Sequence, residues 1–394
     1  MSQPGARYLD GPVAIIGAGI GGLTAALSLQ HFGVPVRVFE QARALREIGA
    51  GVTITPNAMS VLDFLGIGPA LAEQAGETPR YFVRSAADGR ELERGPDPDS
   101  FVPEFGARYC NLHRADLHVA LTDAVTKSDP DAIALDHRFD YLEQDGDKVI
   151  AHFSNGATFE APALIGADGG ASAVRNAVFG GQDASYTGHV ALRALVPFTR
   201  VPRAIIADPY ALYVGAGRSL IHYPLRRQAT MNLLGNAQAS QWQAEGWAIP
   251  ATVQEFLGLF DDFQEPVREL IAAIPEPDLF KWGLRDREPL PVWTRGRVTM
   301  LGDAAHPMTP YLGQGACMAI EDGMILGRAF GASQDLAEAF SRYEAARRDR
   351  ANGVQLAARY QGTQHHGSTA SGPGTGKTAV TLGLFSYNPV TESI

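Results

Sequence analysis

The segment 13–40 constrains the fold more than any other part of the sequence. The short apolar strand Val13–Ile16 runs into the turn Gly17-Ala18-Gly19-Ile20-Gly21-Gly22, which opens a helix rich in Ala and Leu, and a second strand ends at Glu40. A glycine-rich turn between a strand and a helix, followed by a second strand with an acid at its end, is the fingerprint of a dinucleotide site. The sequence therefore predicts a βαβ unit that binds a dinucleotide.

Three glycines of this turn each have a separate physical task. Gly17 permits the tight turn, Gly19 lets the backbone approach a pyrophosphate, and Gly22 allows the helix to pack closely on the strand. Amide groups at the helix N-terminus, together with the helix dipole, bind the phosphates. Glu40, which lies 21 residues after Gly19, accepts hydrogen bonds from a ribose diol. The pattern leaves open which dinucleotide is bound.

Composition places the chain among ordinary globular proteins. It has 394 residues, of which 45% are hydrophobic and 19% are charged, and a formal net charge of −10. The negative charge argues against nucleic acid and anionic membranes as partners. Cys110 and Cys317 lack metal-ligand spacing, and no apolar stretch approaches the roughly 20 residues of a spanning helix. We expect a cytoplasmic protein without a bound metal and without a membrane span.

Two later segments repeat the pattern of an apolar strand followed by an acid-bearing turn. They are Gly166–Arg175, with the sequence GADGGASAVR, and Gly302–Pro307, with the sequence GDAAHP. Asp303 is placed to reach a polyol hydroxyl, and the helix start at Gln314-Gly315-Ala316 offers amides to an electron-accepting ring. Taken singly, each segment could equally be a capped turn.

Together, in this order and spacing, the three motifs resemble those of the group A flavoprotein monooxygenases. The resemblance extends from Val13 to about Arg359 and is strongest to single-component aromatic hydroxylases such as salicylate hydroxylase and 6-hydroxynicotinate 3-monooxygenase. It implies an α/β fold in which a Rossmann-like FAD-binding domain of the glutathione-reductase type carries an inserted, mainly antiparallel β-sheet substrate domain and C-terminal helices. The implied boundaries are 1–80, 105–184 and 285–331 for the FAD-binding domain, 81–104 and 185–284 for the substrate domain, and 332–394 for the C-terminal helix and tail.

The resemblance also implies a resident FAD and a transient NADH or NADPH. The segment around Asp168 would serve both nucleotides, and Asp303 would lie at the ribityl chain of FAD. The residues expected to bind the cofactor are Gly17, Gly19, Gly22, Glu40, Gln41, Arg46, Arg114, Asp168, Asp303, Gly315 and Ala316.

The sequence departs from the family pattern in places. Thr53 stands where relatives can have a histidine, and the segment Gly362–Ile394 has no match. His306 lies inside a cofactor motif, so we interpret it as structural in preference to catalytic.

The implied reaction requires a base near the substrate. In the family, NAD(P)H reduces FAD, O₂ adds at flavin C4a, and the hydroperoxide transfers oxygen to an aromatic ring that is most reactive as a phenolate. In the strand Ser219–Pro224, alternation points His222 and Tyr223 to opposite faces. We favour His222 as the base because the ordinary pKa of a histidine is near neutrality, with Tyr223 as the second choice. Either residue could instead only pack in the sheet.

Further residues are expected to contact the substrate. Arg193, on a neighbouring strand, could pair with a substrate carboxylate, because a planar guanidinium matches that group, or could be a solvated surface arginine. Thr53 and Pro310 are expected to line the cavity between the flavin and the sheet.

These inferences predict an FAD-dependent monooxygenase of aromatic catabolism. Its substrate would be a hydroxylated aromatic or pyridine-type acid, hydroxylated with or without displacement of a ring substituent. Its partners would be that substrate, NAD(P)H and O₂, and a homodimer is the favoured assembly. The alternatives are a monooxygenase of a larger polycyclic scaffold, of the tetracycline-inactivating type, or a non-catalytic flavin-binding redox sensor.

Overall fold

A computed structural model describes residues 8–45, 50–181, 184–239, 242, 249–365, 379 and 382–394. The βαβ unit predicted at the N-terminus lies at the centre of a sheet that is parallel except at the β18 edge. Because β1 runs parallel to its neighbours β11 and β2, the turn after β1 opens at the carboxyl edge of the sheet, where α/β folds bind ligands. The strands, in spatial order, are β18 (Thr294–Arg295), β19 (Val298–Met300), β11 (Leu164–Gly166), β1 (Val13–Ile16), β2 (Val36–Phe39) and β7 (Ile133–Ala134).

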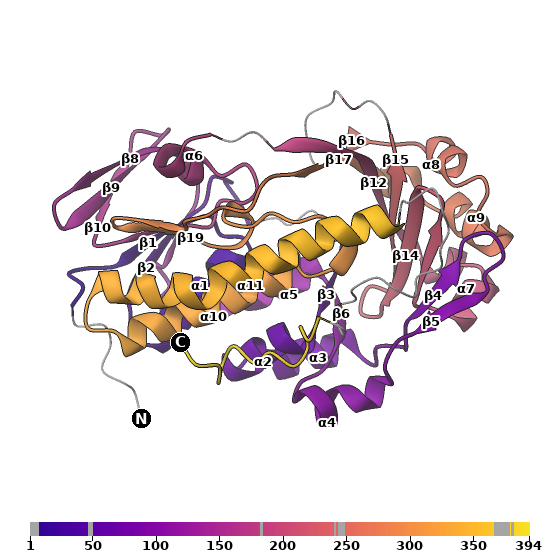
Figure 1. The fold of residues 1–394 in the computed structure, drawn as a ribbon, viewed down its shortest axis with the longest axis horizontal. Coiled ribbons are helices and arrows are strands. Elements are labelled where there is room, and N and C mark those ends of the chain that lie inside the picture. The colour runs from indigo at the N-terminus through magenta and orange to yellow at the C-terminus, as the bar shows by residue number, and fades with distance from the viewer. Residues whose placement is uncertain are drawn as a thin grey trace.

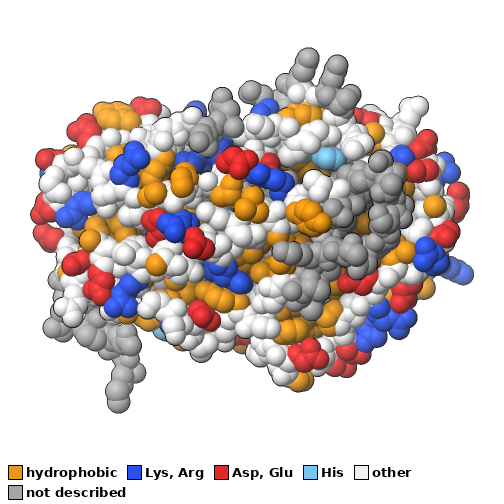
Figure 2. All heavy atoms as spheres, in the orientation of Figure 1, with side chains coloured by type: hydrophobic (Ala, Val, Ile, Leu, Met, Phe, Trp, Pro, Cys, Tyr) orange, Lys and Arg blue, Asp and Glu red, His pale blue; other side chains and the backbone are white. Residues whose placement is uncertain are grey.

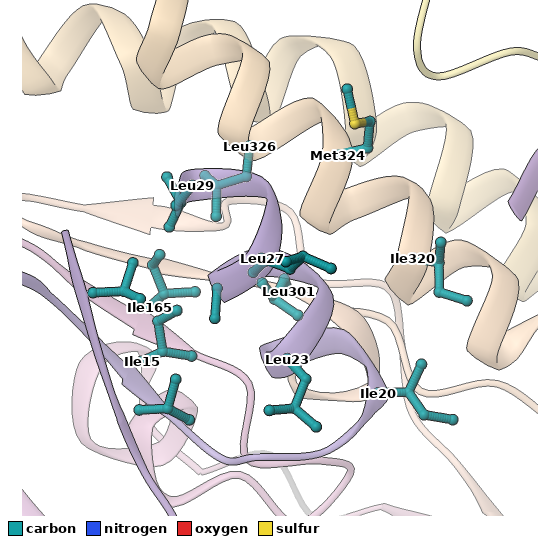
Figure 3. Close-up of a cluster of buried hydrophobic side chains, with 14 of the residues drawn as sticks. Ile15, Ile20, Leu23, Leu27, Leu29, Ile165, Leu301, Ile320, Met324 and Leu326 are labelled. Atoms are coloured by element: carbon teal, nitrogen blue, oxygen red, sulfur yellow. The ribbon is translucent and has the colours of Figure 1, made fainter. Parts of the chain in front are cut away.

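Helices α1 (Ile20–His31) and α10 (Gly315–Ala332) pack against each other beside this sheet, and Figure 3 shows the buried side chains around them. Glycines at four-residue intervals on α10 allow the close approach. A Cβ on Gly327 would lie 2.2 Å from Ser28 Oγ, and one on Gly323 would lie 2.8 Å from the Ala25 nitrogen. Larger residues at these positions would separate the helices and displace the turn that α1 begins.

A second, mixed sheet forms the other part of the molecule (Figure 1). Its neighbouring strands are antiparallel except for β13 and β4. Helices α7 (Arg203–Ala207), α8 (Val253–Leu259) and α9 (Glu265–Ala272) lie on its outer side. The strands, in spatial order, are β16 (Ile249–Pro250), β17 (Phe280–Asp286), β12 (Ser185–Pro197), β15 (Thr230–Gln238), β14 (Arg218–Leu225), β13 (Ala211–Gly215), β4 (Phe82–Ser85) and β5 (Glu91–Arg94).

Side chains on the two faces of this mixed sheet have different surroundings. On one face, Leu192, Leu220 and Leu233 belong to a buried core. This core also contains Phe256, a residue of α8, and Phe260, which immediately follows α8. The alternate positions of the same strands face the parallel sheet across a cavity. The period of two in the strands therefore assigns each residue either to the core or to the cavity.

The remaining elements lie outside the two large sheets. Helix α11 (Leu336–His365) runs along the molecule beside α10 and toward the mixed sheet (Figure 1). Acidic and basic side chains are interspersed on the face shown in Figure 2. No helix in the described ranges is long and apolar enough to span a bilayer. The other elements are β3 (Gly51–Ile54) paired with β6 (Cys110–His113), the meander β8 (Phe139–Asp145), β9 (Lys148–Phe153) and β10 (Thr158–Ala161), and helices α2 (Pro56–Phe64), α3 (Gly68–Ala75), α4 (Phe101–Phe105), α5 (Arg114–Ser128) and α6 (Ala173–Phe179).

Candidate active site

The glycines of the first turn differ in what surrounds them. Gly17 has a φ of +107°, and a Cβ there would lie 2.5 Å from the Ala167 carbonyl oxygen. A Cβ on Gly22 would lie 2.0 Å from the Gly17 oxygen. At Gly19, in contrast, a Cβ would meet no protein atom within 4 Å, and Gly19 lines a cavity of about 800 Å³. The protein itself therefore requires Gly17 and Gly22, whereas the open space at Gly19 is available to a ligand.

Glu40 is fixed beside this turn. Its carboxylate accepts a hydrogen bond from the Ala18 nitrogen at 3.0 Å and another from the Ala42 nitrogen at 2.9 Å. The acid therefore orders the backbone next to Gly19 and keeps its remaining acceptor capacity for a ligand. Gln41 is exposed at this edge, and Arg46 lies outside the described residues.

Asp168 organises the second glycine-rich segment without lining the cavity. Its carboxylate accepts hydrogen bonds from Ser172 Oγ at 2.5 Å and from the Val174 nitrogen at 3.1 Å, at the start of α6. Gly169 and Gly170, which follow it, do line the cavity. Asp168 thus caps a helix and shapes the loop, and the backbone after it faces the ligand space.

Asp303 and Arg114 line another part of the same cavity, together with Gly315 and Ala316 at the start of α10. The Asp303 side chain is open to the cavity but lies deep in the protein, and this desolvation raises its pKa against the opposing effects of His306 and Arg114. The α10 N-terminus adds free backbone amides and the positive end of a helix dipole. This wall can hold a polyol and an electron-accepting ring.

Buried ion pairs behind Asp303 hold its loop in place. His306 and Asp322 are fully buried, with Nε2 and Oδ2 2.6 Å apart, and Asp322 also accepts a hydrogen bond from the Gly302 nitrogen at 2.9 Å. Burial alone would raise the pKa of Asp322, but His306 and Arg347 lower it to about 2. His306 is thus structural here, and its pairing with Asp322 was not predicted from the sequence. The signal for it was a pair of acids, Glu321 and Asp322, inside a mostly apolar helix.

His222 lies on the opposite face of the sheet from the cavity, which corrects the prediction that it is the base. Its side chain is fully buried near Tyr213, and its Nδ1 lies 3.1 Å from the Pro209 carbonyl oxygen. Burial lowers its pKa to about 4, so the ring is neutral at physiological pH. The alternation along β14 was predicted correctly, but the face turned to the cavity is the one with Ser219 and Tyr223.

Tyr223 belongs to a group of tyrosines on the cavity wall. This grouping was not predicted from the sequence. The ring of Tyr223 lies 5.6 Å from that of Tyr210, whose hydroxyl is 2.7 Å from the Tyr109 hydroxyl. Burial raises the pKa of Tyr223, although Arg193 and a hydrogen bond with Thr53 act in the opposite direction. Tyr223 therefore stays protonated at neutral pH and can donate a hydrogen bond into the cavity.

Arg193 also lines the cavity, where its guanidinium carbon lies 5.6 Å from the centre of the Trp282 ring. Nη2 is 3.5 Å from the Gly51 carbonyl oxygen, and Nε is buried without a hydrogen-bond partner. No carboxylate of the described residues pairs with it. Thr53 and Pro310, both expected in this wall, are also found there. The cavity thus presents a partly desolvated cation and a protonated phenol to its contents.

Comparison with known proteins agrees with this geometry. A family model described as the FAD binding domain matches residues 10–358. The chain is 38% identical to a 3-hydroxybenzoate 6-hydroxylase of Polaromonas naphthalenivorans over 91% of this chain and 88% of the relative. It is 35% identical to a 6-hydroxynicotinate 3-monooxygenase of Bordetella bronchiseptica over 87% and 89% of the two chains.

Solved structures show the same fold. HpxO of Klebsiella pneumoniae, in complex with FAD and uric acid, has a TM-score of 0.83 and 29% identity, covering 97% of this chain and 95% of its own. A substrate complex of salicylate hydroxylase has a TM-score of 0.79 and 26% identity, with 96% of both chains covered. The predicted α/β fold class is thereby confirmed.

Proposed function

The chain belongs to the FAD binding domain family, and from this premise we propose that it is a monooxygenase that uses NAD(P)H and O₂ to hydroxylate a hydroxylated aromatic acid. The residues present fit FAD: the open space at Gly19, the exposed carboxylate of Asp303, Arg114 and the α10 N-terminus all face one cavity. When bound there, FAD supplies the reaction with dioxygen that ordinary side chains cannot perform.

The position of Arg193 is the observation that indicates the class of substrate. A guanidinium held in the cavity without a carboxylate partner from the described residues favours an anionic ligand. Burial lowers the pKa of Arg193, because desolvation disfavours the charged guanidinium. A carboxylate bound beside it would stabilise that charge. Arg193 therefore binds and orients the carboxylate, with Trp282 packed against its guanidinium.

Tyr223 acts on the ring hydroxyl of the substrate. Since its own pKa is raised, it keeps its proton and donates a hydrogen bond to the substrate oxygen. This bond stabilises the phenolate more than the neutral phenol, because charged acceptors make stronger hydrogen bonds. The cation of Arg193 acts in the same direction. These groups promote ionisation of the substrate, so that no histidine base is needed on this wall.

Apolar residues complete the wall and exclude water from the reacting ring. Ile221, Leu234 and Trp282 come from the mixed sheet, and Pro310 comes from the loop after the GDAAHP segment. Because these side chains exclude water, the electrostatic interactions of Arg193 and Tyr223 with the substrate are stronger.

Several finer features remain predictions of this proposal: a pyridine-type acid in place of a benzoate, displacement of a ring substituent, NADH in preference to NADPH, a homodimer and a cytoplasmic location. The 3-hydroxybenzoate and 6-hydroxynicotinate hydroxylases named above support single-ring acids over a larger polycyclic scaffold. A redox sensor would bind FAD without turnover.

The proposal is tested with purified, FAD-loaded protein and a panel of hydroxybenzoates and hydroxynicotinates. We expect at least one acid to accelerate NADH or NADPH oxidation and to give a product that has gained one oxygen atom, with or without loss of a ring substituent. Oxidation that no member of the panel accelerates would contradict the proposal. A colourless protein that does not take up FAD would contradict it at an earlier step.

A further inference from the structure

The C-terminal tail is bound firmly to the rest of the molecule although it contains no helix or strand in its described part, residues 379 and 382–394. Arg328 donates hydrogen bonds to the carbonyl oxygens of Pro389 and Glu392, each at 2.7 Å. The guanidinium of Arg350 lies 3.7 Å from the centre of the Tyr387 ring. Contacts from two helices therefore fix the path of the tail.

This path carries two adjacent apolar side chains to different environments. Leu384 and Phe385 are only 3% and 4% exposed. Leu384 belongs to a buried cluster that also contains Met318 and Val354, residues of α10 and α11, and it does not line the cavity. Phe385 is part of the same cluster but also forms part of the cavity wall.

Phe385 continues the row of aromatic rings on the substrate side of the cavity. Its ring centre lies 5.9 Å from that of Tyr109 in an edge-on arrangement, and Tyr109 is hydrogen-bonded to Tyr210, the neighbour of Tyr223. Phe105 makes a second edge-on contact with Phe385 at 5.7 Å. These contacts restrict the ring of Phe385, so it cannot retreat freely from a ligand that approaches the tyrosines.

We propose that the C-terminal tail is a wall of the substrate cavity and that Phe385 limits the size of the aromatic ring system admitted beside Tyr109 and Tyr210. This inference rests on the proposed function, because it concerns the cavity assigned there to an aromatic acid. It extends that proposal to a segment without a counterpart among the motifs that mark the family. Substrate selection would then depend in part on a tail that is remote in sequence from the cofactor motifs.

Two probes of different size test this inference on the full-length, FAD-loaded protein. 3-Hydroxybenzoate is the small probe, and 4-hydroxy-2-naphthoate keeps the same arrangement of carboxylate and hydroxyl while adding a fused ring. Dissociation constants are measured from quenching of tryptophan fluorescence and from the change in flavin absorbance. We expect Phe385→Ala to shift the preference between the probes toward the naphthoate by about tenfold, as for other pockets that gain apolar space.

Leu384→Ala is the matched control, since it removes an equally buried side chain of the same tail outside the cavity wall. It should lower the melting temperature and leave the preference between the probes at the wild-type value. A Phe385→Ala protein with wild-type preference would overturn the inference, as would an equal shift in Leu384→Ala. If Phe385→Ala does not fold, Phe385→Leu supplies the same comparison. Because these are binding measurements, they are independent of the turnover that tests the proposed function.

Discussion

The guanidinium carbon of Arg193 lies 5.6 Å from the centre of the Trp282 ring, on the wall of the cavity. Arg193→Gln should raise KM for an aromatic acid about 100-fold, since losing one partner of a buried charge pair costs about 2–5 kcal/mol. The neutral analogue 3-hydroxybenzamide is the matched control, and its KM should change little. Steady-state kinetics with both compounds check this. Equal changes for the acid and the amide would exclude Arg193 as the carboxylate ligand.

Tyr223→Phe should leave FAD binding unchanged and shift the pH dependence of hydroxylation. Without the hydrogen bond from Tyr223, the bound phenol ionises less readily, so the acidic limb of the pH profile of kcat should move upward by about one pH unit. In the wild type, burial raises the pKa of Tyr223, so this residue keeps its proton at neutral pH and adds no alkaline limb there. A pH profile that coincides with the wild type would remove Tyr223 from this role.

His222→Asn should retain hydroxylation, because His222 faces the core and not the cavity. The substitution should instead change the pH dependence of stability. The pKa of His222 is about 4 in the folded state and about 6.5 in the unfolded state, so the unfolded state takes up the proton first as the pH falls. This group alone should lower the free energy of unfolding by about 2 kcal/mol between pH 7 and pH 5, and the loss should end near pH 4. Urea unfolding of both proteins at several pH values measures the difference.

Gly19→Ala and Gly22→Ala should have separable effects. Gly19 has a φ of −75°, which alanine adopts, and space around it, so stability without FAD should be unchanged while FAD binds about tenfold more weakly. Gly22→Ala meets the Gly17 oxygen and should destabilise the protein by about 1–3 kcal/mol. Thermal unfolding of the FAD-free proteins and titration with FAD distinguish the two. A Gly19→Ala protein that retains FAD normally would show that no ligand approaches this atom closely.

Arg347→Met should destabilise the protein by about 3–5 kcal/mol, since it leaves Glu321 and Asp322 buried with fewer positive partners. Arg348→Met on the same helix is the control. Its partners Glu344 and Asp349 form a partly exposed network, and its loss should cost no more than about 1 kcal/mol. Denaturant unfolding gives both values. Similar losses for the two variants would contradict the structural role assigned to Arg347.

Local signals in the sequence predicted the cofactor half of the site. Gly17 and Gly22 are required by the backbone of a turn only six residues long, so their pattern is visible in one short segment. The same holds for the segment that contains Asp303. Asp168 shows the limit of such signals, because its carboxylate caps α6 while the backbone next to it lines the cavity.

The sequence by itself determined the βαβ unit, the family resemblance and the alternation along β14, because each depends on residues close together in the chain. Only the tertiary structure decided that Tyr223, and not His222, faces the cavity, since the packing of α8 and α9 selects the buried face. Likewise, only the tertiary structure shows that Arg347 pairs with Asp322 and that Phe385 lines the cavity. Such contacts form between distant segments whose relative position depends on the packing of the whole chain, and no short pattern records them.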